Sequence, residues 1–402
     1  MLRSRIAALL GAAAVATGTL VVPARPASAD AGWAVRAIAD MALARRVTKG
    51  EGVKIALVGE GVDPKVRALR GSLEPQHDLV GTPRPTRRYD TVIASLLVGD
   101  SGPANAPGFV SGARLLPVRA YPNGKDPGAT HWNHQAYGAK ALADGITWAA
   151  DHDAGVIAVD VSTFDDNGAV SQAVAYALDK NAVVVTATGM DREVYDLQPA
   201  AAPGVIAVAS VKAGGERDGK FTRPSSQIAL AAPASKTIGA GVGGPWEVWG
   251  PGVSLAWVTA AATMVRSKYP KLTPQQVAMA LTTSARHPKG AGHYDTDLGF
   301  GYVNAKGALD KAKAISQQLA AEPAEEFAAT SRFGGGGKPG DVRAAKPRLP
   351  VMGAAAGLAL LGLALLGAAL LLAVRKRKPL EPEPEAPAES AEKESEAPPV
   401  VG

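Results

Sequence analysis

Short apolar runs alternate with amphipathic segments across roughly residues 50–312. Runs of this kind begin at Val53, Val156, Ala182, Val205 and Ile228. Residues 141–152 instead repeat apolar positions at helical spacing, with Leu142, Ile146 and Ala149 on one side. Strands that are apolar throughout are typical of parallel sheets with both faces covered. The pattern therefore predicts an α/β fold, with helices on both faces of a parallel sheet.

Further helices are indicated by their ends. Residues 256–268 form a helical run that stops before a Tyr-Pro pair. The next helix starts after Thr273, a capping residue, and has Pro274 in its first turn. Residues 30–48 contain Trp33 and apolar positions at helical spacing, so a helix is expected before the first strand.

The longest apolar run lies near the C-terminal end, at residues 351–374. It is long enough to cross a hydrocarbon core of about 30 Å, and four basic residues, 375–378, follow it directly. A buried core helix is the alternative, but polar Pro-rich and Gly-rich segments flank the run and no later domain could bury it. We expect a single transmembrane helix with the basic residues in the cytoplasm.

The first 29 residues have the pattern of a secretory signal. Arg3 and Arg5 precede an apolar stretch, and Ala-Ser-Ala at 27–29 forms a cleavage site before Asp30. An uncleaved anchor is the alternative, which the well-placed cleavage site disfavours. The globular part is therefore expected outside the cytoplasm, on a single-pass protein of the cell membrane.

These signals divide the 402-residue chain into six parts. They are a signal peptide at 1–29, a lead-in at 30–49, a globular domain at 50–319, a flexible linker at 320–350, a transmembrane helix at 351–374 and a cytoplasmic tail at 375–402. Beyond the basic cluster, the tail is rich in Glu, Pro, Ala and Ser, which predicts disorder. The tail is either a docking element or a solvated tether.

Composition narrows the possible functions. The chain has 0 Cys, so an exported domain cannot rely on disulfides. The net charge of +6 is concentrated partly in the signal and in the cluster beside the membrane, so it does not indicate nucleic-acid binding.

The first candidate for chemistry is Gly-Val-Ser-Leu-Ala at residues 252–256, which opens the helical run. It resembles the nucleophile motif Gly-Thr-Ser-(Met/Phe)-Ala-Ala-Pro of subtilisin-like serine proteases. The resemblance implies a subtilisin-like α/β fold and places Ser254 at the nucleophile's position. The plainer interpretation is that Ser254 is a small residue at a tight helix start, where serine is a good cap.

Three other motifs of that family occur upstream, and each has lost its chemical group. The strand at 53–58 resembles the one that carries the catalytic aspartate, with Gly59 in the aspartate's place. The segment 89–99 resembles the family's His-Gly-Thr-x-Val-Ala-Gly helix, with Tyr89 for histidine. Residues 182–191 resemble the strand that ends in the oxyanion asparagine, which Met190 replaces.

The resemblance also covers the cleft and the end of the domain. Residues 156–162 are similar to the substrate-lining Val-Ile-Asn-Met-Ser-Leu-Gly edge, which assigns Val159, Asp160, Val161 and Ser162 to the substrate cleft. Residues 297–305 resemble the family's closing segment. Trp257 follows Ser254 closely, and its indole is expected to fill part of the cleft. The Trp-containing lead-in, signal, linker and anchor together resemble mycosins, the membrane-anchored subtilisin-like proteins of type VII secretion.

The replacements predict an inactive protein. A serine hydroxyl needs a neighbouring base, and that base needs a third group to orient it. Gly59 supplies no side chain, and a tyrosine with an ordinary pKa of about 10 is no base near neutral pH. We therefore expect a non-catalytic binding or scaffolding element, with type VII secretion components or an extended peptide as partners.

Two alternatives remain open. One is an active serine endopeptidase that uses Ser254 with an unusual base such as His77. Glu60 is a poorer stand-in, because neighbouring strand residues point to opposite faces and its side chain is expected to face away from Gly59. The other is a cleft that binds an extended peptide by strand addition.

No cofactor or metal site is predicted. His131 and His134 have a spacing compatible with two ligands on one helical turn, but no acidic third ligand stands at a telling distance. Family members often bind calcium, and no acidic loop in this sequence identifies such a site.

Overall fold

The computed structural model describes residues 27–100, 107–127, 129, 138–165, 167–188 and 197–321. Met190, His131, His134, the apolar signal region, the linker beyond residue 321, the predicted transmembrane helix and the tail lie outside these residues. Within them, no helix is both long and apolar enough to cross a membrane.

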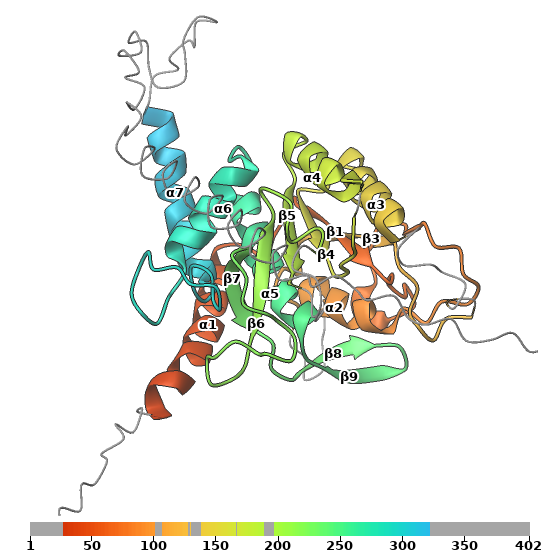
Figure 1. The fold of residues 1–402 in the computed structure, drawn as a ribbon, viewed down its shortest axis with the longest axis horizontal. Helices are drawn as coiled ribbons and strands as arrows, with labels where there is room; N and C mark the ends of the chain where they lie inside the picture. Colours follow the sequence, from red (N-terminus) through yellow and green to blue (C-terminus); the bar gives the residue numbers. More distant parts are fainter. Residues whose placement is uncertain are drawn as a thin grey trace, which may run out of the picture. The chain divides into compact units, whose positions relative to one another are not determined.

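A parallel sheet forms the centre of the described chain (Figure 1). Its seven described strands lie in the order β2-β3-β1-β4-β5-β6-β7. The strands are β1 (Lys54–Gly59), β2 (His77–Asp78), β3 (Arg114–Arg119), β4 (Val156–Val159), β5 (Val183–Ala187), β6 (Ile206–Val211) and β7 (Ile228–Pro233). The middle strands are buried along nearly their whole length, which is the reason that their sequence shows no polar alternation. The predicted α/β fold with a parallel sheet is confirmed.

Helices cover both faces of this sheet. On one face lie α2 (Arg88–Val98) and α5 (Pro251–Lys268), with α1 (Ala27–Val47), α6 (Pro274–Ser284) and α7 (Ala305–Ala321) behind them. On the other face lie α3 (Ala139–Asp151) and α4 (Ala169–Asp179). Adjacent residues of one strand pack into different cores, since Ile55 and Leu57 face the α5 side while Ala56 and Val58 face the α3 side.

Several element ends differ from the expectation. Helix α5 begins at Pro251, earlier than the predicted 256, because proline is well suited to the first turn of a helix. Ser254 therefore lies inside the helix. Helix α6 has the expected cap, in which Thr273 and Gln276 form a reciprocal capping box. A short 3-10 helix (Arg67–Leu69) and a hairpin of β8 (Thr237–Gly241) and β9 (Gly244–Val248) complete the described elements.

The first turns of α2 and α5 meet the sheet at one place. Gly59 ends β1, and Asp160 follows β4 directly. These strands are neighbours, with Val58 opposite Val159. Side chains from the carboxyl ends of adjacent parallel strands share one edge, which is where open α/β sheets usually place their sites.

Candidate functional site

Asp90 occupies the space beside Gly59. A Cβ atom added to Gly59 would lie 2.2 Å from Asp90 Oδ2, far inside contact distance. Asp90 is buried, and its Oδ2 accepts a hydrogen bond from the Gly61 N–H at 3.1 Å. A carboxyl group therefore lies at this end of β1, but α2 supplies it in place of the strand.

Tyr89 and Asp160 enclose Gly252 in the same way. The Gly252 N–H donates to Tyr89 Oη at 3.2 Å. A Cβ atom at Gly252 would lie 2.8 Å from Tyr89 Oη and 2.6 Å from Asp160 Oδ2. The first turn of α5 thus presents backbone to Tyr89, with no room for a side chain between them.

Ser254 is not brought to this place. It is fully buried, and its hydroxyl donates towards the Ala232 carbonyl oxygen at 3.1 Å and the Pro233 carbonyl oxygen at 3.2 Å. The hydroxyl therefore binds the end of β7 within the core. Trp257, one helical turn from Val253, packs against the Phe109 ring at 4.8 Å between centroids.

Glu60 does not face away as expected. The chain turns after Gly59, and Glu60 Oε1 accepts the Tyr89 N–H at 2.8 Å while Oε2 accepts the Asn123 side-chain amide at 2.5 Å. The alternation of side chains applies only while the strand continues, and β1 ends at Gly59. Glu60 thereby satisfies a free N–H group in the first turn of α2.

We call Glu60, Asp90 and Asp160 the carboxyl cluster. Burial, and then the negative charge of Glu60, raise the pKa of Asp160 to about 8. Burial first, and then the charges of Asp160 and Glu60, also raise the pKa of Asp90 well above its usual value. Asp160 is therefore largely protonated at neutral pH, and its Oδ2 is buried without a hydrogen-bond partner.

The proposed alternative base, His77, lies elsewhere. It is in β2, and its ring stacks on Trp148 of α3 at 4.3 Å. Helix α3 covers the face of the sheet opposite to α5. The sheet therefore separates His77 from Ser254.

The predicted substrate edge is only partly free. Val159 is fully buried within the sheet, and Asp160 points towards Gly252. Beyond Ser162, Thr163 is already paired with Gln198, through backbone hydrogen bonds of 3.0 and 2.9 Å. An added peptide strand would have to pair ahead of that bridge.

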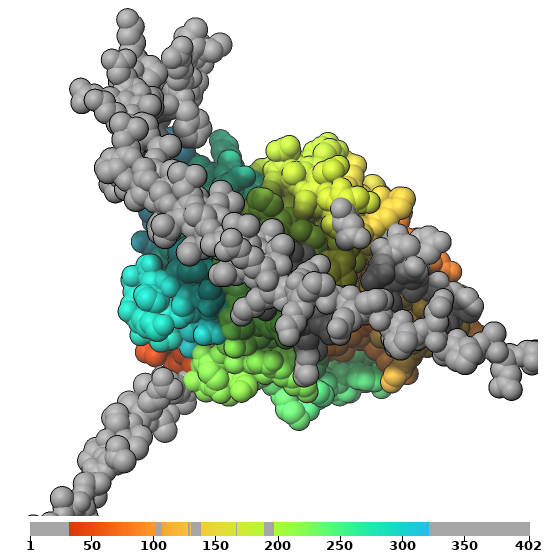
Figure 2. Space-filling model, in the orientation of Figure 1, coloured from red at the N-terminus to blue at the C-terminus, as the bar shows by residue number. Residues whose placement is uncertain are grey.

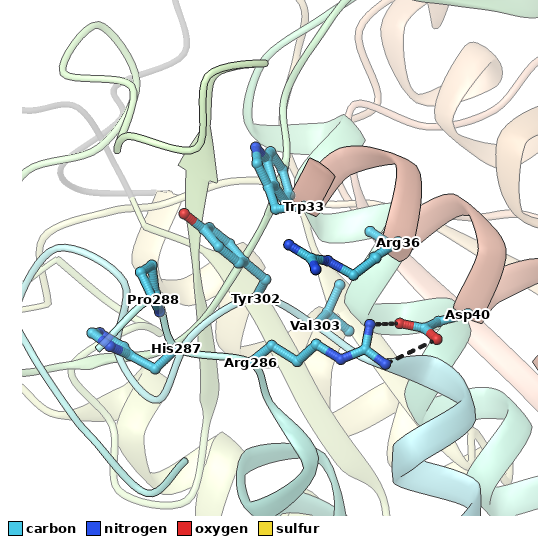
Figure 3. Close-up of a pocket in the computed structure, with 9 residues that line it drawn as sticks. Trp33, Arg36, Asp40, Arg286, His287, Pro288, Tyr302 and Val303 are labelled. Carbon is cyan, nitrogen blue, oxygen red and sulfur yellow. Dashed lines mark hydrogen bonds and ion pairs between the residues drawn. The ribbon is translucent and has the colours of Figure 1, made fainter. Parts of the chain in front are cut away.

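A separate cavity of about 580 Å³ lies where α1 meets the segments around residues 286 and 302 (Figure 3). Trp33 stacks on Tyr302 at 4.4 Å, Asp40 pairs with Arg286, and Arg36 points into the same space. The apolar pattern of the sequence does not predict this cavity. Trp33 is the one signal in the sequence, because a large aromatic side chain on a helix is often buried against another element.

Comparison with known proteins identifies the family. The model of the subtilase family, peptidase S8, matches residues 50–303. The chain belongs to the subtilase family. The resemblance found in the degenerate motifs is therefore confirmed, and the subtilisin-like fold with it.

Mycosins are among its relatives. Mycosin-1 of Mycobacterium tuberculosis is 29% identical over 327 residues, covering 66% of this chain and 70% of the relative. Mycosin-3 of the same organism is 27% identical over 399 residues, covering 83% and 82%. Thermitase of Thermoactinomyces vulgaris is 31% identical over 193 residues, covering 47% and 65%.

Solved structures of related proteins have a similar fold. MycP1 from the ESX-1 type VII secretion system has a TM-score of 0.59 at 25% identity, covering 69% of this chain and 85% of that one. A chain of the periplasmic assembly of the ESX-5 inner membrane complex has a TM-score of 0.57 at 22% identity, covering 76% and 86%. The protein is thus a mycosin-like subtilase related to type VII secretion proteases.

Proposed function

We propose that this subtilase does not cleave peptides and acts as a membrane-anchored, extracytoplasmic binding or scaffolding element beside a type VII secretion apparatus. The observation that carries the proposal is the contact of Tyr89 with Gly252. In a working centre the residue at the histidine position must contact the nucleophile. Tyr89 contacts Gly252 and not Ser254. We infer that Gly252 stands at the nucleophile's position.

All three triad positions in this interpretation lack their chemical groups. Gly59 and Gly252 have no side chain, and burial raises the pKa of Tyr89 still further above 10, so the phenol remains neutral. Asp90 and Asp160 fill the space that the lost side chains would need. A side chain restored at Gly59 would therefore overlap Asp90, and one restored at Gly252 would overlap Asp160 and Tyr89.

The test of inactivity is covalent labelling with a serine-directed fluorophosphonate. We expect no labelling of the full chain in detergent, with thermitase as the positive control, and the same result for Ser254→Ala. Labelling of the wild-type protein that disappears in Ser254→Ala would contradict the proposal and favour the active endopeptidase.

The scaffolding part is supported by the relatives, which include structures from the ESX-1 system and the ESX-5 periplasmic assembly. We expect the tagged full chain, extracted gently from membranes, to retain secretion-channel subunits, and we expect Ser254→Ala to retain them equally. Recovery of the protein without any such subunit would contradict the scaffolding role and leave inactivity untouched.

Peptide binding along the old cleft is the second candidate. It is favoured by the retained strand end at β4 and disfavoured by the Thr163–Gln198 bridge. The test is to screen a library of extended peptides for binding to the protein. Peptides that bind the wild type but not Val161→Pro would support this candidate, because proline removes a backbone N–H that strand addition would use.

A further inference from the structure

The loop between α6 and α7 brings together three side chains that can bind a metal ion. Donor atoms of His287, His293 and Asp295 all lie within 4.8 Å of one another. The loop is exposed on the face shown in Figure 2, where it is coloured cyan. His287 also lines the cavity of Figure 3.

The backbone holds two of these residues firmly. Arg286, next to His287, exchanges two backbone hydrogen bonds of 3.0 Å with Tyr302. Asp295 exchanges backbone hydrogen bonds with Gly299, and its Oδ1 accepts the N–H groups of Asp297 and Leu298. Its Oδ2 faces both His287 and Lys289.

The buried ring of His287 also points to a ligand. Its side chain is only 1% exposed, and Nε2 is buried without a hydrogen bond of good geometry. Nε2 lies 3.2 Å from Asp295 Oδ2. Two ligands of a tetrahedral zinc ion, each about 2.0–2.2 Å from the metal, are separated by roughly 3.3–3.5 Å. The observed spacing is therefore close to that of ligands already arranged around one ion.

His293 reaches the same place because the loop reverses direction. Gly290 and Gly292 have φ angles of +115° and +75°, which side-chain-bearing residues rarely adopt. The imidazole of His293 then lies against that of His287, with ring centroids 4.5 Å apart.

In this structure the positive charge beside Asp295 comes from the Lys289 ammonium group. Its Nζ lies 3.1 Å from Asp295 Oδ2, and its backbone N–H donates to His287 Nδ1 at 3.1 Å. A metal ion at Nε2 moves the ring proton to Nδ1, so Lys289 must give up both interactions. Losing the ion pair costs little, because the Lys289 side chain is 63% exposed and surface ion pairs contribute little. The Lys289 N–H belongs to an exposed residue, so it turns to water when Nδ1 becomes a donor.

We propose that His287, His293 and Asp295 bind a divalent transition-metal ion, with Zn²⁺ preferred and water at the fourth position. Two imidazoles and one carboxylate suit zinc, whereas calcium takes six to eight oxygen ligands. The ion closes the loop between α6 and α7 and fixes one wall of the cavity beside α1. The site goes beyond the scaffolding role and does not depend on it.

The test measures Zn²⁺ binding to the purified full chain in detergent, with every affinity tag removed. Equilibrium dialysis with metal analysis should give one equivalent, and Co²⁺ should show the visible absorption of a tetrahedral complex. His293→Ala keeps the buried His287 in place and should weaken binding at least tenfold, since changes outside the direct ligands already cost about 10- to 100-fold. Lys289→Gln removes the competing cation and should strengthen binding.

His152→Ala serves as the matched control, because His152 is exposed directly after α3 and stacks on Trp148. Its Zn²⁺ affinity should equal that of the wild-type chain. The proposal is overturned if the wild-type chain binds no stoichiometric Zn²⁺, or if His293→Ala binds it as tightly as the wild type.

Discussion

At the scale of single residues, the end of β1 and the first turn of α5 depend on residues that fit only in pairs. The glycine at 59 and the aspartate at 90 fit only as a pair, since any side chain at 59 would overlap Asp90 Oδ2. Gly252 fits in the same way against Tyr89 and Asp160. The effects of mutating the two members of such a pair on the free energy of unfolding are therefore expected to be strongly non-additive.

The Gly59–Asp90 pair gives the first prediction. Gly59→Ala should lower the free energy of unfolding by about 1–3 kcal/mol through overpacking. Combining it with Asp90→Ala should recover part of that loss, because the second change removes the clashing oxygen. Urea unfolding of the two single variants and the double variant measures the coupling. Simple additivity would show that the two side-chain positions do not compete for space.

Asp160 gives the second prediction. Its pKa of about 8 lies well above the usual 3.8, so between these values the folded protein holds a proton that the unfolded chain lacks. The free energy of unfolding should therefore fall as pH rises through this window, by about 1.4 kcal/mol for each unit of pKa difference at most. Asp160→Asn should reduce that fall, with Asp90 supplying the part that remains, and should be more stable than the wild type above pH 8.

Melting temperatures across a pH series check this prediction. Asp144→Asn, on the exposed face of α3, provides the control, since it should leave the shape of the profile unchanged. A wild-type slope that persists undiminished in Asp160→Asn would assign the titration to another group.

At the scale of elements, helix α1 is fixed by one face only. Trp33 is 5% exposed, donates its Nε1–H to the Ala213 carbonyl oxygen at 3.0 Å and stacks on Tyr302. Met41 and Ala44 are buried on the same side. Val35 and Ile38, which also follow helical spacing, are 66% and 59% exposed. The sequence predicts the helix, but both of its faces are apolar, so periodicity could not identify the packed one.

The third prediction concerns this attachment. Trp33→Ala should lower the free energy of unfolding by about 3–5 kcal/mol, because a large buried ring and its hydrogen bond are lost. Val35→Ala, on the exposed face of the same helix, should change it by less than about 0.5 kcal/mol. Thermal unfolding of both variants distinguishes them, and equal losses would mean that the packed face of α1 is assigned wrongly.

At the scale of the whole chain, the subtilase domain is expected to be the exported part of a single-pass membrane protein. The fourth prediction is that the full chain remains in the membrane fraction after alkaline carbonate extraction. Deletion of residues 351–374 should release the domain, because the remaining chain has no comparable apolar run after signal removal. Retention of the deletion variant in the carbonate pellet would show that another segment anchors it.

The sequence by itself determined the class of fold and the order of the family's motifs, and it predicts the loss of two catalytic groups. Apolar runs, caps and turn residues act locally, so they can be recognised without knowing what packs against them. The cap at Thr273 and the glycine at the end of β1 were visible in this way.

Only the tertiary structure decided which residues meet. A shift of two positions along α5 separates Ser254, which binds the end of β7, from Gly252, which contacts Tyr89. Helix periodicity permits both assignments, because small residues line this whole turn. The entry of Asp90 into the space beside Gly59, the turn that redirects Glu60 and the meeting of His287 with Asp295 all depend on backbone paths through space. Contacts of that kind leave no periodic signal along the chain.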